Sequence, residues 1–303
     1  MPRVPPTNCL FEAGRGGDDM AQSRESEGIV RGMDDPRLLD ALEANTYAAY
    51  ASYAVDSGGE QIAAPDRLTY IAGIPFELFN GVARARMAPD DSDDLDAQIT
   101  AALQPFIMRG HPMFWWTGPS SAPKDLGARL VEHGLVDDGS MPGMAIALSD
   151  LRQTHEAPAR LVTEQVNSPR LVEEFTLALR AGYGVPEEMQ APLAALGERQ
   201  ALRPDSPWLY LVGRLDGEPV STVQLFLHAG VAGIYAVSTA PNARRQGIGE
   251  ALTHAALLAA RERGYAVGIL QSSAMGLHIY ERLGFRALTS FHLYLWRGES
   301  FAA

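Results

Sequence analysis

Hydrophobic residues recur with two different periods in the second half of the chain. Between Ser168 and Arg180 they recur every three to four positions behind a capping serine and a proline, which predicts an amphipathic helix. From Trp208 to His228 the shorter period of strands is interrupted by Asp216-Gly217, a pair typical of a tight hairpin turn. The expected elements are helices at 168–180, about 186–199, 247–263 and 274–283, and strands at 208–215, 219–228, 233–238, 266–271 and 287–296.

The first half of the chain shows a similar order of elements. Gly110 and Gly134 follow helical patterns and predict where these helices end, as Gly264 and Gly284 do in the second half. The expected elements are helices at 38–54, 93–109 and 124–132, and extended segments at 68–74, 76–86, 112–117 and 144–148. Leu126–Leu135 also echoes Gly276–Phe285 at an offset of 150 residues.

Repetition at half the chain length favours duplication of one domain. We therefore expect an α/β fold of two tandem domains, at 34–152 and 158–298, each with a mixed sheet flanked by helices. Residues 1–33 are rich in Pro, Gly, Arg and Glu without periodicity, which predicts a disordered extension. Two unrelated α/β units of similar rhythm remain the alternative to duplication.

Charge is unevenly distributed along the chain, whose formal net charge is −12. Residues 1–150 contain 23 acidic and 11 basic residues, and the rest contains 14 of each. Such a balance disfavours nucleic-acid binding, which depends on clustered Lys and Arg. The single cysteine, Cys9, excludes an internal disulfide framework and a cysteine-rich metal site, and it fits a reducing cytoplasm. No apolar run reaches the length of a membrane span. We therefore expect a cytoplasmic protein without nucleic-acid, membrane or metal partners.

The segment Val237–Leu252 has the composition of a phosphate cradle. A strand leads into a polar loop, and Gly247 and Gly249 then open a helix. Backbone N–H groups at the start of a helix have no internal partner, and the helix dipole favours an anion there. Arg244 and Arg245 add positive charge to the same turn.

Two common phosphate-binding motifs do not fit this segment. The P-loop requires a Gly-Lys-Ser/Thr run that the chain lacks, and the dinucleotide fingerprint requires a small residue where Leu252 stands. The arrangement Arg-x-x-Gly-x-Gly at 244–249 instead resembles motif A of the GNAT acetyltransferase superfamily. Residues 273–285 resemble the second CoA-side motif of that superfamily, usually written Asn-x-x-Ala-x-x-Leu-Tyr-x-x-x-Gly-Phe. The resemblance covers about 160–296, whereas the first half is similar only in its order of elements, as in a tandem-GNAT protein with a degenerate N-terminal domain.

The resemblance implies acetyl-CoA as cosubstrate and no metal. Residues 244–249 would hold its pyrophosphate, and the backbone of 237–239 would bind the pantetheine arm. Tyr280 would protonate the departing thiolate, a general-acid role, and Ser273 would contact the cofactor arm where the family often has Asn. The implied site is Tyr280 as the catalytic residue, with Val237, Ser238, Thr239, Arg244, Arg245, Gln246, Gly247, Ile248, Gly249 and Ser273 binding the cofactor.

A general base is not evident from the sequence. The strands at 222–228 and 233–237 contain no carboxylate. His228 is the nearest candidate, although a histidine beside a turn is more often a surface residue. Glu173 and Glu174 lie on a helix where solvated carboxylates are common. Deprotonation through water, or an amine that arrives neutral, would also serve.

Aromatic residues around the motifs have structural interpretations as well. Phe175, Tyr183 and Tyr235 are candidates for an acceptor pocket, yet aromatics at such positions are more often core. A core aromatic on a helix face is the structural interpretation of Tyr280, but its place four residues before Gly284 favours a functional role. Trp115-Trp116 predicts a buried strand.

The first half lacks the residues of the cradle. The counterpart of motif A is Met87–Asp96, and Leu130 stands where the second half has Tyr280. A pyrophosphate would meet like charge there, so we expect this domain to retain the fold without the cofactor. The aspartates that replace the cradle are Asp90, Asp91, Asp93, Asp94 and Asp96.

These features favour an acyl-CoA-dependent N-acyltransferase that moves an acetyl group to an amine of a small molecule or peptide. A non-catalytic CoA-binding regulatory module is the alternative, favoured by the missing base. A hydrolase is disfavoured because no Gly-x-Ser-x-Gly elbow is present. A homodimer is one possible assembly.

Overall fold

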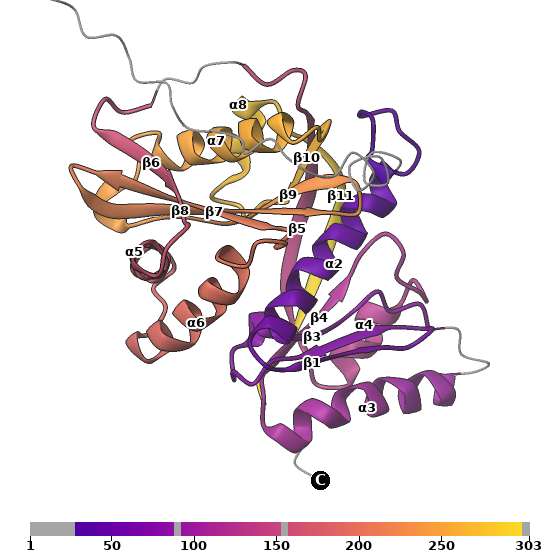
Figure 1. The fold of residues 1–303 in the computed structure, drawn as a ribbon. Helices are drawn as coiled ribbons and strands as arrows, with labels where there is room; N and C mark the ends of the chain where they lie inside the picture. Colours follow the sequence, from indigo (N-terminus) through magenta and orange to yellow (C-terminus); the bar gives the residue numbers. More distant parts are fainter. Residues whose placement is uncertain (1–27, 88–91, 153–156, 299–303) are drawn as a thin grey trace, which may run out of the picture.

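A single mixed β-sheet runs through the computed structural model, which describes residues 28–87, 92–152 and 157–298 (Figure 1). Within these residues the sheet has eleven strands in the order β1-β2-β3-β4-β11-β5-β10-β9-β8-β7-β6. The helices are α2 Leu38–Asp56, α3 Ser92–Arg109, α4 Leu126–Glu132, α5 Pro169–Tyr183, α6 Gln190–Ala201, α7 Ile248–Glu262 and α8 Leu277–Leu283. The strands are β1 Glu60–Ala63, β2 Leu68–Ile71, β3 Asn80–Ala83, β4 Met113–Thr117, β5 Val136–Ala147, β6 Leu161–Gln165, β7 Trp208–Leu215, β8 Glu218–His228, β9 Val231–Thr239, β10 Val267–Gln271 and β11 Arg286–Trp296.

The two halves of the chain build their strands in the same way. In the second half β6, β7, β8 and β9 pair in sequence as antiparallel neighbours, and β10 joins β9 in parallel. In the first half β1, β2 and β3 are antiparallel neighbours, and β4 joins β3 in parallel. The repeated topology confirms the predicted tandem arrangement of two similar α/β units.

The last strand of each half is inserted into the sheet of the other half. β5 of the first half lies between β10 and β11, and β11 of the second half lies between β5 and β4. Each inserted strand pairs antiparallel with the parallel strand of the other half. β5 pairs with β10, as in Gly143 with Gln271, and β11 pairs with β4, as in His292 with Thr117, so the exchange is nearly symmetric. Without the other half, each half would have an unpaired sheet edge. Such an edge exposes free N–H and C=O groups and favours aggregation.

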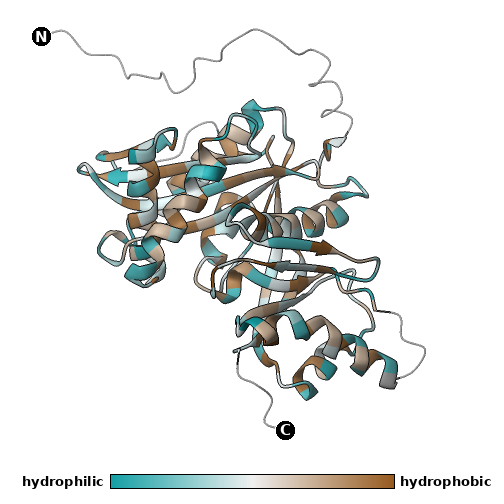
Figure 2. Cartoon of the chain, turned by 60° about the horizontal axis from the view of Figure 1, so that its bottom comes forward, coloured by the Kyte–Doolittle hydropathy of each residue, from teal (hydrophilic) through white to brown (hydrophobic). Residues whose placement is uncertain are grey.

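Helices cover both faces of the second-half sheet (Figure 1). Along β7, Leu211 belongs to the apolar cluster of α7, whereas Tyr210 and Val212 belong to the cluster that contains Val172 and Phe175 of α5. This alternation is the period of two expected for a strand buried on both faces. Figure 2 shows the corresponding pattern, with hydrophobic segments concentrated on the central strands and hydrophilic residues on turns and outer helix surfaces.

Helix α2 belongs to the first half in sequence but packs on strands of the second half. The Asn45 side-chain amide donates to the carbonyls of Phe226, His228 and Val231 at 3.3, 2.9 and 3.3 Å, and its oxygen accepts from the Tyr235 hydroxyl at 2.7 Å. A fully buried amide is thus satisfied by the turn that joins β8 and β9.

Aromatic rings continue this contact along the seam between the halves. Tyr53 stacks on Trp208 with ring centroids 5.1 Å apart, and Tyr50 lies 4.6 Å from the Trp116 ring. Trp115 and Trp116 are both buried, which confirms the predicted buried strand.

Some expectations from the sequence require correction. Residues 76–86 are not one extended segment, because a 3₁₀ turn at Glu77–Phe79 precedes β3. β1 and β6 were not predicted, since β1 is exposed throughout and neither strand shows a clear alternation. The predicted strand at 144–148 is the end of the longer β5.

The predicted extension at 1–33 lies mostly outside the described residues. Within the described part, Val30 is buried and its N–H donates to the Gly230 carbonyl at 3.0 Å. Residues 28–33 are therefore part of the fold, because they cover the β8–β9 turn.

Candidate functional site

Parallel strands β9 and β10 are paired over only two residues and then diverge. The pairs are Ala232–Gly268 and Gly233–Ile269. Beyond them β9 bulges on its other side, between the β8–β9 pairs Gln224–Tyr235 and Thr222–Ser238. The rest of β9 thus has no strand partner on its β10 side.

Hydroxyl groups of β8 hold the bulge in place. Ala236 adopts φ +47°, a left-handed conformation that is strained for a residue with a side chain. The Thr222 hydroxyl donates to the Ala236 carbonyl at 2.7 Å, and the Ser221 hydroxyl donates to the Ser238 carbonyl at 2.6 Å. These bonds fix the backbone of the predicted site residues Val237, Ser238 and Thr239.

The loop after β9 forms the predicted cradle at the start of α7. Arg245 and Gly247 have φ values of +60° and +76°, and Gly247 is the N-cap residue of the helix. Within the described chain, the backbone N–H groups of Gly247, Ile248 and Gly249 donate no hydrogen bond. Unpaired N–H groups at the positive end of a fifteen-residue helix suit an anion.

Gly249 leaves space in this cradle that the chain itself does not fill. A Cβ atom added there would meet only the Thr239 hydroxyl oxygen at 3.4 Å and a Val237 methyl carbon at 3.8 Å, which are ordinary contacts. Its backbone has no left-handed φ, in contrast to Gly247. The glycine therefore permits the close approach of a group that is not part of the chain.

Arg244 stabilises the loop through the backbone. Its Nε donates to the Thr239 carbonyl at 3.0 Å, and a terminal nitrogen donates to the Gly182 carbonyl at 2.7 Å. The predicted phosphate contact of this side chain would thus compete with two internal hydrogen bonds. Arg245 and Gln246 are exposed at the rim of the cradle.

Tyr280 lies half-buried on α8, where it packs against the same apolar cluster as α7. Its ring contacts Phe285 edge-on at 5.8 Å. Burial raises the pKa of the Tyr280 hydroxyl, and nearby Tyr183 raises it further, so the phenol is protonated at neutral pH. Ser273 is exposed, and its hydroxyl accepts from the Gly276 N–H at 3.3 Å, a contact that shapes the turn before α8.

The structure places Tyr183 in contact with β9, whereas the sequence gives it only as one of three candidate aromatics. It ends α5, and its hydroxyl donates to the Val237 carbonyl at 3.1 Å. Phe175 and Tyr235, the two other aromatics considered for a pocket, are core residues. The sequence signal for Tyr183 is only its position directly before Gly184, where α5 stops.

None of the candidate general bases lies at the divergence of β9 and β10. His228 is exposed and pairs with Val231. Val231 lies six residues before Val237 on β9, which corresponds to about 20 Å of strand. Burial lowers the pKa of the His228 ring, which stacks on Phe226. Glu174 is paired with Arg170 and Arg214, and Glu173 is exposed on α5.

The first half has the same divergence of parallel strands, but its own backbone closes it. β3 and β4 pair at Gly81–Phe114 and Val82–Trp115, and Arg84 follows with φ +51°. The loop after β4 then crosses the gap, because Ala122 donates to the Ala85 carbonyl and accepts from the Met87 N–H, both at 3.0 Å.

The residues that replace the cradle in the first half are only partly described. Asp90 and Asp91 lie outside the described residues, as does the side chain of Asp93. Asp96 accepts from the His133 ring at 3.1 Å, and Gln98 donates to Asp94 at 2.8 Å. The counterpart of Tyr280, Leu130, is fully buried.

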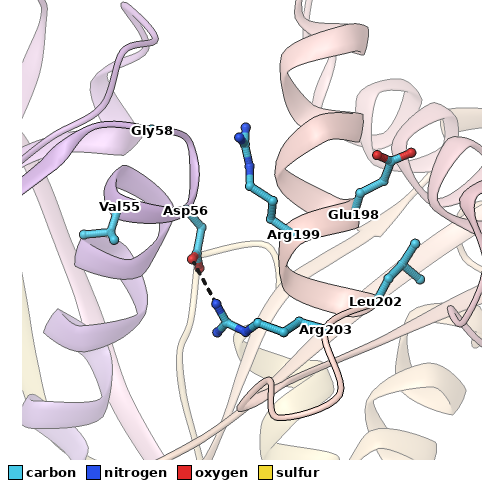
Figure 3. Close-up of a pocket in the computed structure, with 7 residues that line it drawn as sticks. All are labelled: Val55, Asp56, Gly58, Glu198, Arg199, Leu202 and Arg203. Carbon is cyan, nitrogen blue, oxygen red and sulfur yellow. Dashed lines mark ion pairs between the residues drawn. The ribbon is translucent and has the colours of Figure 1, made fainter.

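A hollow of about 440 Å³ lies elsewhere, between the ends of α2 and α6 (Figure 3). Asp56 lies 3.8 Å from the Arg203 guanidinium across it and accepts from Gln200 at 2.8 Å. A second hollow of about 270 Å³ lies between Leu103 and His133. Neither contains a residue of the cradle.

The described residues contain neither a candidate membrane span nor a metal-binding cluster. No helix there is long and apolar enough to cross a membrane. No group of three or more His, Cys, Asp or Glu side chains is arranged to hold a metal ion in that part of the chain.

Comparison with known proteins gives a family for the segment that contains the site. Residues 206–287, from before β7 to the start of β11, match the family Acetyltransferase (GNAT) domain. No curated protein matches the chain.

Solved structures show the same architecture over most of the chain. A GCN5-related N-acetyltransferase from Kribbella flavida is similar with a TM-score of 0.64 and 22% identity, over 88% of this chain and 96% of that one. A tandem GNAT protein from the clavulanic acid biosynthesis pathway has a TM-score of 0.56 and 13% identity, over 89% and 98%. A GCN5-related N-acetyltransferase from Sphaerobacter thermophilus has a TM-score of 0.55 and 19% identity, over 69% and 70%. Residues 206–287 thus match a GNAT acetyltransferase domain, and the described part of the chain has the fold of tandem GNAT proteins.

Proposed function

We propose that the chain is an N-acyltransferase that moves an acetyl group from acetyl-CoA to an amine of a small molecule or peptide. The observation that carries the proposal is the coincidence, within the family-matched segment, of the diverging strands and the cradle with unpaired N–H groups. Gly249, whose backbone has no left-handed φ and whose added Cβ would meet no close contact within the chain, supports a phosphate in that cradle.

Each part of the site has a role in this proposal. Acetyl-CoA supplies an activated thioester. The N–H groups of Gly247, Ile248 and Gly249 hold the pyrophosphate, with Arg244, Arg245 and Gln246 around it. The backbone of Val237, Ser238 and Thr239, which has no strand partner on its β10 side, binds the pantetheine arm, and Ser273 lies in the turn after β10.

Tyr280 acts as the general acid. The acceptor nitrogen forms a bond to the acetyl carbonyl carbon, and the carbon–sulfur bond breaks. The Tyr280 hydroxyl gives its proton to the departing sulfur and regains one from solvent. The hydroxyl carries this proton at neutral pH, because its pKa lies well above 7. The amine loses its own proton to water, since the candidate bases named above lie elsewhere.

The first half contributes no second cofactor site in this proposal. The bridge at Ala122 occupies the gap between β3 and β4. The first half instead stabilises the second through α2 and β5, and it shapes the side from which the acceptor enters.

The test is turnover of acetyl-CoA with a panel of amines, and the release of the CoA thiol is the signal that is measured. Tyr280→Phe should lower kcat by about 100-fold, the low end of general-acid effects for a good leaving group, with CoA affinity within about twofold of wild type. Tyr294→Phe is the matched control, because its hydroxyl lies against α4 in the first half.

A non-catalytic CoA-binding module is the second candidate, favoured by the absence of the candidate bases from the site. CoA binding without turnover for any amine would support that module. Full activity of Tyr280→Phe would instead remove the acid role from Tyr280.

A further inference from the structure

The end of α5 covers the strand that the proposed function assigns to the cofactor arm. Tyr183 is 57% exposed, yet its hydroxyl is directed to β9 and donates to the Val237 carbonyl at 3.1 Å. Val237 lies in the bulge, beyond the last β9–β10 pair, so this carbonyl has no strand partner on that side. The tyrosine therefore occupies a backbone acceptor that the pantetheine arm would use.

A second contact ties the same turn to the cradle. Arg244 donates to the carbonyl of Gly182, the residue before Tyr183, at 2.7 Å and to Thr239 at 3.0 Å. Gly182 approaches β9 so closely that an added Cβ would lie 2.4 Å from the Ser238 hydroxyl oxygen. One guanidinium thus joins the phosphate cradle, the end of β9 and the end of α5.

We propose that Gly182 and Tyr183 form a latch that is closed in the free protein and is opened by acetyl-CoA. The proposal rests on the proposed function, because it assumes the cofactor in the cradle and along β9. A phosphate is a stronger acceptor for a guanidinium than a backbone carbonyl is, so the pyrophosphate draws Arg244 from Gly182. The pantetheine arm then replaces the Tyr183 hydroxyl at Val237.

The latch is also connected to α6. The segment after α5 is held by the same turn, since Gly184 and Val185 both donate to the Arg180 carbonyl, at 2.8 and 3.1 Å. Arg180 in turn donates to the Pro186 carbonyl at 3.0 Å and to Gln190 at 2.9 Å. Release of Tyr183 therefore loosens the connection between α5 and α6.

Calorimetric titration of CoA into full-length wild type and Tyr183→Phe tests whether the Tyr183 hydroxyl competes with the cofactor. Phe keeps the ring and removes the competing hydrogen bond, so CoA should bind about three- to tenfold more tightly. Adenosine 3′-phosphate 5′-diphosphate carries the pyrophosphate without the pantetheine arm, and its affinity should not change. Tyr294→Phe, in the first-half core, should leave both affinities as in wild type.

Hydrogen exchange supplies a readout that does not depend on affinity. The Gly184 and Val185 amides should exchange at least several-fold faster in wild type saturated with CoA. Equal or weaker CoA binding by Tyr183→Phe, or unchanged exchange at these amides, would overturn the latch while leaving the proposed function intact. Absence of CoA binding to wild type would overturn the proposed function, and the latch with it.

Discussion

Gly247 and Gly249 lie two residues apart in the cradle, but the backbone requires a glycine at only one of them. Gly247 has φ +76° at the N-cap of α7, whereas Gly249 lies in the helix without a left-handed φ, and a Cβ there would make only ordinary contacts. A glycine inside a helix costs about 1 kcal/mol relative to alanine. The proposed close approach of the cofactor phosphate would account for a glycine at 249.

Substitution of these two glycines should separate folding from binding. Gly249→Ala should leave the melting temperature unchanged or raised, and it should weaken CoA binding at least about tenfold, because the methyl group enters the phosphate space. Gly247→Ala should lower stability by about 1–2 kcal/mol because of its left-handed φ.

Gly73→Ala is the matched control for this pair. It lies in the first half with open space and no left-handed φ, so CoA affinity should not change. Isothermal titration and thermal melts measure both quantities. Unchanged CoA affinity in Gly249→Ala would remove the phosphate from this part of the cradle.

Among the helices, α2 connects the two halves through its contacts with strands of the second half. Its Asn45 amide satisfies three carbonyls around the β8–β9 turn, and its Tyr53 hydroxyl donates to the Gln224 side chain at 2.6 Å. Thr46 accepts from the Gln271 amide at the end of β10 at 2.7 Å. The helix thus contacts β8 and both of the diverging strands, β9 and β10.

Asn45→Ala should be strongly destabilising. It leaves buried carbonyls and the Tyr235 hydroxyl without their partner, and each such group costs about 1–3 kcal/mol. We expect the free energy of unfolding to fall by about 2–4 kcal/mol in urea titrations. Asp40→Ala, an exposed substitution on the same helix, should change it by less than about 1 kcal/mol. Equal effects of the two substitutions would show that Asn45 does not anchor α2.

Local patterns predict some elements well and others poorly. β7 and β8 were predicted almost to the residue, because alternation is interrupted at Asp216-Gly217, whose residues adopt the positive φ values of a hairpin turn. The bounds of α7 follow from its apolar stripe and its glycines. β1 has four exposed residues and thus no hydrophobic signal.

At the scale of the whole molecule, the exchange of β5 and β11 is the feature that no local pattern encodes. A strand's own sequence sets its alternation, whereas its neighbours are set by packing between segments far apart in the chain. The cradle was predicted because its residues are consecutive. The hydrogen bond of Tyr183 to Val237 and the bridge of Ala122 to Ala85 were not predicted, because the partners are distant in sequence.

The exchange predicts that neither half is stable alone. Segments 28–152 and 157–298 each lack the strand that the other inserts, and the loss of β5 also removes the Pro142 carbonyl that accepts from the Ser272 N–H at 3.0 Å. Expressed separately, the segments should show no cooperative melt. Coexpressed, a tagged 157–298 should retain 28–152 through purification. A cooperative melt of 157–298 as an isolated monomer would contradict the interlocked sheet.

The halves also differ in charge and in whether backbone hydrogen bonds bridge their diverging parallel strands. The acidic excess lies wholly in residues 1–150, and in that half the loop after β4 closes the gap between the parallel strands. In the described part of the second half, no backbone hydrogen bond bridges the diverging strands β9 and β10. We therefore predict one cofactor site per chain, in the second half.

The stoichiometry of CoA binding to the full-length protein tests this claim most directly. Calorimetry of wild type should give one site per chain, and Gly249→Ala should weaken that site without revealing another. Two equivalents of CoA per chain, or a single site that Gly249→Ala leaves unchanged, would contradict the account.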